Sequence, residues 1–345
     1  MTRRASAPAR ALLVSGALVI VLALSLAAAV ATGAQPIDLG RAWAGLQPDR
    51  DIAFSLRLPR AVLGAIVGAS LAGAGVALQA LLRNPLADPF VLGVSGGAAL
   101  GATVLSAFAV VAGLPAIADA AGAAGLSPVA AAAFLGALAA AVGVYALGRA
   151  GGRLVPERAL LVGVVFNAFA SAIITGIKVT VSPSKAQSLL SWLVGTLGYE
   201  SPGALAAAGV FSGVGLAVIG LLSGRMNLLA LGEEGAAAVG VDVPRTRALL
   251  FVAASLVTGA AVSLAGLIGF VGLLVPHAAR LALGPDYRVV VPASALGGAA
   301  ALVLADTLAR LLFRSLGTEP PVGVVTALVG GPVFLWMLSR EGARA

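Results

Sequence analysis

Few side chains in this sequence could take part in chemistry. The chain has no cysteine and one histidine, His277, which lies in the apolar string GFVGLLVPHAAR. Asp306 is the one carboxylate placed well inside an apolar run, and Arg310 follows it by four residues. At that spacing two side chains share a helix face and can neutralise each other. We therefore interpret Asp306 as half of an ion pair and His277 as a packed residue, and we expect no metal site.

The chain lacks the residues needed to hydrolyse ATP itself. A P-loop requires G-x-x-x-x-G-K-[ST], and the two lysines, Lys178 and Lys185, do not follow a glycine. An ion-coupled carrier, the alternative from a different class, should hold ionisable groups in mid-membrane. A membrane enzyme would need a nucleophile with a base, or clustered metal ligands. The sequence therefore favours a conduit powered by another subunit, without catalytic residues or a cofactor of its own.

The segments that must position these residues are apolar and long enough to cross a bilayer. Hydrophobic residues make up 60% of the chain and charged residues 10%, whereas a soluble domain has about 25% charged residues. Spans of about 20 residues cross the hydrocarbon core. Ten such spans are predicted, at residues 11–32, 61–82, 90–111, 129–147, 159–179, 204–222, 248–264, 266–283, 289–308 and 322–338. The eighth is expected to be broken at Pro276.

Residues 1–345 are thus expected to form a single all-α transmembrane domain, with two halves of five spans in opposite orientation. Most of the 22 Lys and Arg residues fall in loops on the side of the N-terminus. The positive-inside rule therefore predicts that both termini are cytoplasmic. The net charge of +8 does not indicate nucleic acid, because the basic residues are scattered among short loops. The first span could be a cleaved signal peptide, but its length favours a retained helix.

The most distinctive stretch is residues 56–102. Small residues recur there at every fourth position, at Gly64, Gly68 and Ala72 in one span and at Gly93, Gly97 and Gly101 in the next. This spacing lets helix backbones approach closely in lipid. We expect the two spans to form a tightly packed hairpin, joined by a polar turn, and their small-residue faces to provide a roomy pore wall.

The same stretch carries a family resemblance. The ordered strings RLPR, NPLADP and VLGVSGGAALGA, with Gln79 between the first two, resemble the signature of bacterial ABC importer permeases for ferric siderophores, haem and vitamin B12. A second matching string, MNLLALGEEGAAAVGVDVPRTR, covers residues 226–247, and the resemblance extends over nearly the whole chain. It implies a type II ABC importer permease in the cell (inner) membrane. It also implies a homodimer, bound to an ABC ATPase and to an extracytoplasmic substrate-binding protein.

The resemblance further assigns roles to particular positions. Residues that would dock the binding protein are Arg57, Arg60 and Arg310. The pore and packing motif comprises Gln79, Asn84, Pro85, Gly93 and Gly97. A loop at about 225–247 would hold a short helix that docks into the ATPase, through Leu231, Gly232, Glu233, Glu234, Ala237 and Gly240. Residues 154–158 match the position of the inner gate. The expected cargo is an intact metal chelate, first a ferric siderophore, with haem and vitamin B12 as alternatives.

Overall fold

The computed structural model describes residues 7–108, 121–122 and 125–342, and the chain there is almost entirely helical. The elements are α1 (Ala7–Ala31), α2 (Leu39–Trp43), a π-helical turn (Asp51–Arg57), α3 (Leu58–Leu81), a 3-10 turn (Pro89–Leu92), α4 (Val94–Phe108), α6 (Pro128–Leu147), β1 (Arg149–Ala150), β2 (Arg153–Leu154), α7 (Pro156–Thr180), α8 (Pro183–Leu193), α9 (Pro202–Leu229), α10 (Glu233–Ala238), α11 (Val243–Ala265), α12 (Val271–Leu283), α13 (Tyr287–Leu316) and α14 (Val322–Gly342). The two short strands form one antiparallel hairpin.

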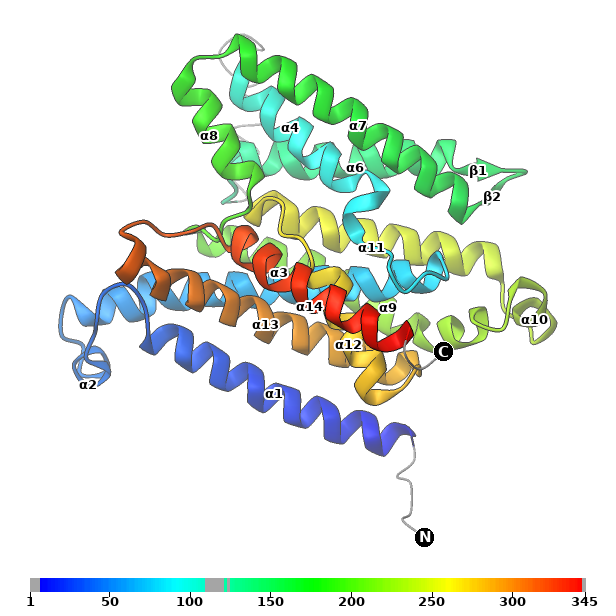
Figure 1. The fold of residues 1–345 in the computed structure, drawn as a ribbon, viewed down its shortest axis with the longest axis horizontal. Helices are drawn as coiled ribbons and strands as arrows, with labels where there is room; N and C mark the ends of the chain where they lie inside the picture. The colour runs from blue at the N-terminus through cyan, green and yellow to red at the C-terminus, as the bar shows by residue number, and fades with distance from the viewer. Residues whose placement is uncertain (1–6, 109–120, 123–124, 343–345) are drawn as a thin grey trace.

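The ten predicted spans correspond one for one to apolar helices of the described residues, and residues 109–111 of the third span lie outside the part of the chain that the structure describes. Seven of these helices are long enough to cross a membrane, and α4, α12 and the apolar part of α14 are shorter. The axes of the long helices lie roughly parallel to one another (Figure 1). Helix α10, the β-hairpin, the start of α1 and the end of α14 lie at one end of the molecule. Following the predicted orientation, we call this the inner end and the opposite one the outer end.

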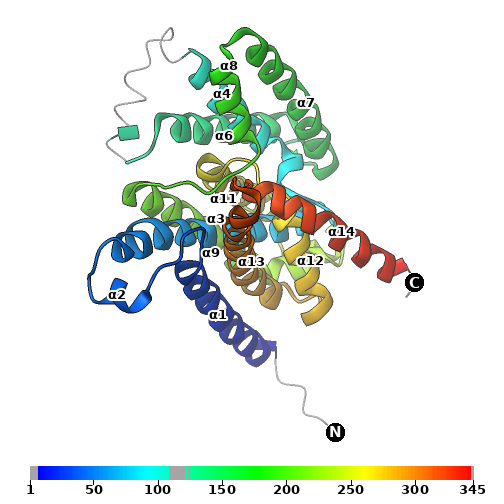
Figure 2. The ribbon, with the colours of Figure 1, turned by 60° about the vertical axis from the view of Figure 1, so that its left-hand side comes forward.

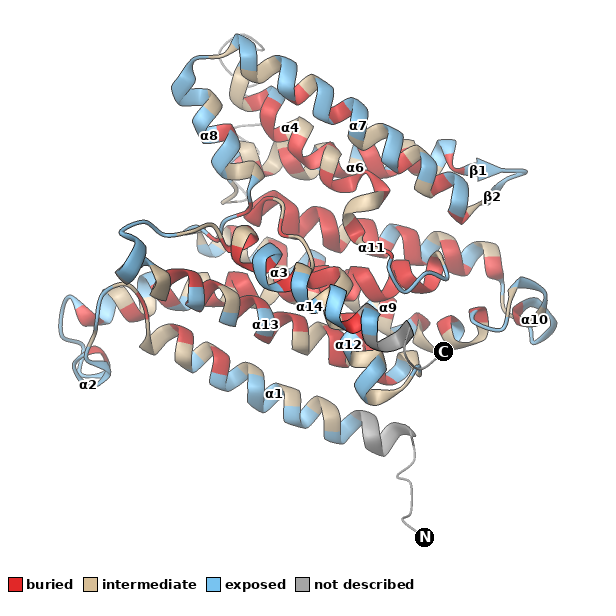
Figure 3. Ribbon diagram, in the orientation of Figure 1, coloured by how far each residue is buried: buried red, intermediate tan, exposed pale blue. Residues whose placement is uncertain are grey.

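Two helices, α3 and α11, form the centre of the molecule. Both are mostly buried, as the colouring by burial shows (Figure 3). Helices α1, α9 and α13 lie on one side of them, and α4, α6, α7 and α8 lie on the other (Figure 2). Each central helix is followed by a segment that is not α-helical and then by a short helix, α4 after α3 and α12 after α11. This correspondence agrees with two halves of five spans.

The small residues permit close packing, but not between the predicted partners. A Cβ atom on Gly68 of α3 would overlap the backbone of Gly298 in α13, and one on Gly97 of α4 would overlap Gly136 in α6. Helix α3 packs chiefly on α13 and α11, while α4 packs chiefly on α6 and α7. The predicted hairpin of two helices packed on each other is therefore wrong. The small-residue face of α3 is buried between helices, so it is not a pore wall.

The eighth span also differs from the prediction. Helix α12 begins only at Val271, because residues 266–270 are not helical and both Gly266 and Phe270 have positive φ angles, +67° and +70°. The preceding carbonyl of Ala265 accepts a 2.9 Å hydrogen bond from the backbone N–H of Thr196. Pro276 lies inside α12 and does not end it. The break thus precedes the helix, where glycine permits the turn.

Candidate functional site

The outer end holds a cluster of charged side chains around Asp306 of α13. The Asp306 carboxylate accepts bonds from Arg310 Nε at 3.1 Å and from Arg60 Nη2 of α3 at 2.7 Å. The ion pair predicted from the four-residue spacing of Asp306 and Arg310 is therefore confirmed. Arg60 also pairs with Glu319, which lies in the loop between α13 and α14. The buried Asp306 carboxylate thus joins α3 to α13 through the Arg60 guanidinium, while its bond to Arg310 lies within α13.

Two of the three arginines predicted to dock a binding protein bond to the end of α1. Arg57 Nη1 donates to the carbonyl oxygens of Val30 at 2.9 Å and Ala31 at 3.2 Å. Arg310 Nη1 donates to Ala29 O at 3.0 Å and to Thr32 O at 3.3 Å. These are carbonyl groups that a helix C-terminus leaves without intrahelical partners, and a positive charge there is favourable for the helix dipole.

These contacts determine which of the three arginines a partner could reach. Arg57 is 6% exposed and Arg310 is 5% exposed, whereas the Arg60 side chain is 21% exposed and that of its partner Glu319 is 36% exposed. Arg57 and Arg310 are therefore internal groups rather than surface groups of the outer end. Docking of a binding protein stays a prediction, and Arg60 and Glu319 are the members of the cluster that reach the surface.

The motif from Gln79 to Gly97 builds the inner connection between α3 and α4. Gln79 Nε2 donates to Ala87 O at 3.3 Å and to Leu273 O at 3.4 Å, and Gln79 Oε1 accepts a bond from Arg280. The buried amide therefore ties α3 to its own turn and to α12. Gly93 has a φ of +81° and would bring a Cβ to 3.3 Å from the Cα of Gly163 in α7, which explains the requirement for glycine.

The turn itself, Asn84 to Asp88, is stabilised locally. Asn84 Oδ1 accepts a 2.9 Å hydrogen bond from the N–H of Leu86, across Pro85. Asp88 Oδ1 accepts a 2.8 Å hydrogen bond from the N–H of Phe90. Burial raises the pKa of Asp88 to about 6, and the bond from Phe90 opposes that rise. Gln79, Asn84, Pro85, Gly93 and Gly97 are thus turn and packing residues.

A cavity of about 510 Å³ lies between α4, α7 and the non-helical residues 267–269, and its lining is mostly apolar with several polar side chains on α7. Asn167, Ser171 and Thr175 of α7 line it at every fourth position, and Lys178 lies at its outer end. Asn167 Nδ2 donates to Phe90 O at 2.8 Å, and Asn167 Oδ1 is buried without a hydrogen-bond partner among the described residues. A side chain on Gly96 would occupy the place of this oxygen.

Sequence reasoning missed this cavity. The signal was the spacing of Asn167, Ser171 and Thr175, which places an amide and two hydroxyl groups on one helix face. The signal is weak, because small polar residues also serve in helix packing within membranes.

The inner end carries the short helix predicted within residues 226–247. Helix α10 is preceded by Gly232 with a φ of +103° and followed by Gly240 with a φ of +86°, so the prediction of a short helix bounded by glycines is confirmed. The side chains of Glu234 and Ala237 on α10 are exposed, as is that of Leu231 just before it. Glu233 Oε1 forms an ion pair with Arg247 Nη1, near the start of α11, at 2.6 Å. This pair fixes α10 to a central helix.

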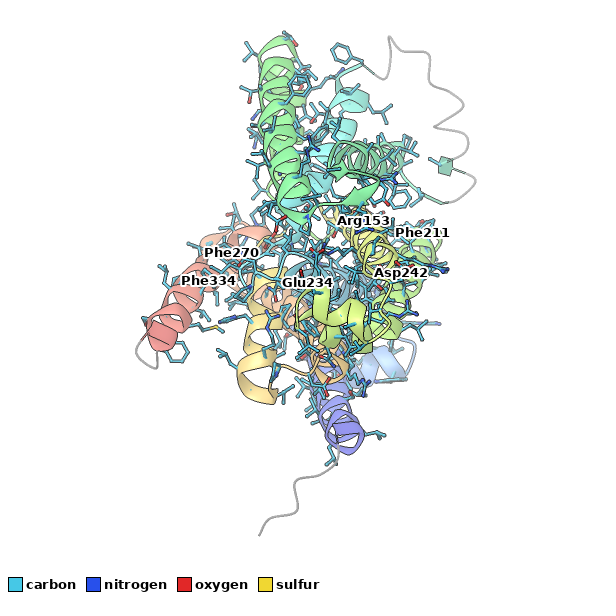
Figure 4. All side chains as sticks on the ribbon, turned by 90° about the vertical axis from the view of Figure 1, so that its right-hand side faces the viewer. Arg153, Phe211, Glu234, Asp242, Phe270 and Phe334 are labelled. Atoms are coloured by element: carbon cyan, nitrogen blue, oxygen red, sulfur yellow. The ribbon has the colours of Figure 1, made fainter. Side chains whose placement is uncertain are left out.

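A second pocket, of about 480 Å³, separates α10 from the β-hairpin. Its lining includes Arg153 and Leu154 of the hairpin, with Glu234 and Asp242 opposite. Figure 4 views this end, with Arg153, Glu234 and Asp242 labelled. The predicted gate residues 154–158 therefore lie across a pocket from the predicted coupling helix.

Comparison with known proteins supplies the family. The FecCD transport family matches the chain over residues 18–340. The chain belongs to this family. A FecCD relative from Halobacterium salinarum, "Cobalamin import system permease protein BtuC", is 47% identical over 85% of this chain and 75% of its own length. "Hemin transport system permease protein HmuU" of Yersinia pestis is 36% identical over 95% of this chain and 96% of its own.

A solved structure shows the same fold as this chain. A metal-chelate type ABC transporter in an inward-facing conformation superposes with a TM-score of 0.79 at 26% identity, covering 95% of this chain and 99% of that chain. A probable iron chelatin transport system permease of Helicobacter pylori is 39% identical over 84% of this chain and 82% of its own. The resemblance drawn from the sequence strings is therefore confirmed, and the chain is an ABC importer permease of the iron-chelate, vitamin B12 and haem family.

Proposed function

We propose that this permease passes an intact metal chelate from the periplasm or cell exterior into the cytoplasm. The cavity along α7, with its row of polar side chains in a mostly apolar lining, carries the proposal. Its hydroxyl and amide groups can form neutral hydrogen bonds with the outside of a chelate. Weak contacts of this kind allow a molecule to leave the site as well as to enter it.

The choice of chelate rests on the relatives. Ferric siderophore is the first prediction from the sequence. However, the relatives named for cobalamin or vitamin B12 reach 47% identity in Halobacterium salinarum and 41% in Vibrio cholerae, against 39% for the iron chelatin permease and 36% for the hemin permease. This ranking supports cobalamin as the first candidate cargo, with ferric siderophore second. The amide-rich rim of a corrin also suits the hydroxyl and amide groups of α7.

The proposed assembly contains an ABC ATPase at the inner end, a binding protein at the outer end and a second copy of the permease. The cavity is walled by α4, α7 and residues 267–269 of one chain. A second copy would supply the opposite wall and enclose the pathway. Large apolar side chains are exposed on α7 and on α14, among them Phe169 and Leu335, and they support an interface there in addition to contacts with lipid.

Transport can be tested in liposomes that contain the permease with its ATPase and binding protein. Labelled cobalamin, ferric siderophore and haem are offered separately outside the liposomes. ATP is enclosed in the liposome lumen, which represents the cytoplasm. We expect ATP-dependent uptake of one intact chelate, with cobalamin transported fastest. Omission of the ATPase is the control. Uptake of free iron without a chelator would contradict the proposed function.

Docking of the binding protein is expected to depend on the Arg60–Glu319 pair. An acidic group of the binding protein would compete with Glu319 for Arg60, so Glu319→Gln should strengthen docking and Arg60→Gln should weaken it. Exposed ion pairs contribute about 0–1 kcal/mol, so each change should be up to about five-fold in Kd at low salt. Arg41→Gln, which removes another exposed pair at the outer end, is the matched control.

Affinity is measured on the permease in nanodiscs at several ionic strengths. Charge reversal at Arg57 or Arg310 is unsuitable, because it would disrupt the internal bonds to α1. Equal affinities for wild type, Glu319→Gln and Arg60→Gln at low salt would show that this pair takes no part in docking.

A further inference from the structure

The groove between α9 and α13 at the inner end has no place in the transport pathway described above. Its volume is about 430 Å³, and its lining includes Ala217, Gly220 and Ser223 of α9 with Arg288, Val291 and Pro292 of α13. We propose that this groove binds one anionic phospholipid, with the acyl chain along the two helices and the phosphate at Arg288. The proposal requires only that the chain is embedded in a membrane and is independent of the cargo.

The membrane-facing part of the groove is apolar and open. A Cβ atom on Gly220 would meet no atom within 4 Å, so the floor of the groove has room for a methylene chain. The neighbouring Leu221 is 84% exposed, and Val214 is also exposed. Such side chains on the outside of a membrane helix contact lipid. The groove therefore opens toward acyl chains rather than toward water.

The inner end of the groove is positively charged. Arg288 lies in the first turn of α13. Its Nη2 lies 3.3 Å from where a Cβ atom on Gly224 of α9 would be. Its guanidinium group thus crosses from α13 to α9. Ser223 of α9 adds a hydroxyl group to the same end of the groove.

The nearest carboxylate does not neutralise this charge by a direct pair. Asp286 Oδ1 accepts a 2.7 Å bond from Asn227 Nδ2 and a 3.0 Å bond from the backbone N–H of Arg288. In the part of the chain that the structure describes, the Arg288 guanidinium has no ion pair with an acidic side chain. A cationic group above an apolar groove at the inner membrane surface matches an anionic headgroup joined to an acyl chain.

The test measures lipid preference in the full-length permease. The protein is placed in nanodiscs of mixed phosphatidylglycerol and phosphatidylcholine, and the lipids retained on release are counted by native mass spectrometry. Wild type should prefer phosphatidylglycerol by about five-fold, the effect of one arginine at a membrane surface. Arg288→Gln should abolish the preference, and Arg245→Gln, an exposed arginine of the inner end outside the groove, should retain it.

A second pair of variants tests the apolar part. Gly220→Leu should fill the groove and reduce retention of both lipids, whereas Gly213→Leu, another α9 glycine with nothing within 4 Å of its Cβ position, should not. Both glycines have open space, so both variants should fold. The proposal is overturned if Arg288→Gln keeps the preference, if Arg245→Gln loses it equally, or if inorganic phosphate abolishes it.

Discussion

Gly75→Ala should prevent this permease from reaching its native packing, although the change adds one methyl group. The new Cβ would overlap the carbonyl oxygen of Gly272 in α12 and lie 3.0 Å from its Cα. Both contacts involve helix backbone, which cannot move aside as a side chain can. Overpacking costs about 1–3 kcal/mol in ordinary cores and more where nothing yields. We expect a loss of about 3 kcal/mol, measured as thermal unfolding in detergent, together with loss of reconstituted uptake.

Gly143→Ala in α6 is the matched control. Nothing lies within 4 Å of its Cβ position, so the alanine should stabilise the helix by up to about 1 kcal/mol. Equal stability of the two variants would mean that α3 and α12 do not approach as closely as the structure has them.

Gly240→Pro should uncouple ATP hydrolysis from transport without preventing insertion into the membrane. Gly240 has a φ of +86° and donates its N–H to Ala237 O at 2.9 Å. Proline fixes φ near −65° and has no N–H, at a cost of about 3 kcal/mol. Since about 1.4 kcal/mol is a factor of ten, coupled uptake should fall by at least about ten-fold. The measurement compares ATP hydrolysis and uptake in the same liposomes.

Two further variants distinguish a change in the turn that follows α10 from a change within the helix itself. Gly240→Ala places an L-residue at a positive φ, which costs about 1–2 kcal/mol, so its defect should be intermediate. Gly235→Ala lies within α10, where its Cβ would meet Leu231 Cβ at 3.3 Å, and should remain coupled. Wild-type uptake by Gly240→Pro would exclude a coupling role for this segment.

The helices were predictable because lipid forces long apolar segments to be helical. Their partners were not. The spacing of Gly68 and Gly97 indicates that another backbone approaches, but it does not specify whether that backbone belongs to the next helix or to one far along the chain. In fact Gly68 meets Gly298 and Gly97 meets Gly136. Residues 266–270 were assigned to a helix because they are as apolar as the helix that follows.

The candidate site shows the same division between local and distant information. The Asp306–Arg310 pair follows from a spacing of four, whereas Arg60 joins it from 246 residues away. The burial of Arg57 was missed because the family resemblance places this arginine on the docking surface, whereas its bonds to the end of α1 depend on the fold. The row of polar residues on α7, Asn167, Ser171 and Thr175, could have been predicted from the sequence, since all three lie on one helix.

The attachment of α1 has a consequence for how the protein is made. Translation delivers α1 to the bilayer long before α13, because Arg310, which bonds Ala29 O, is synthesised 281 residues after Ala29. Until α13 has been inserted, the last carbonyl groups of α1 must bind water at the membrane surface or the nearer Arg57. Helix α1 is therefore fixed in place only after α13 has been inserted, and a nascent chain that stops short of α13 holds it by one arginine instead of two.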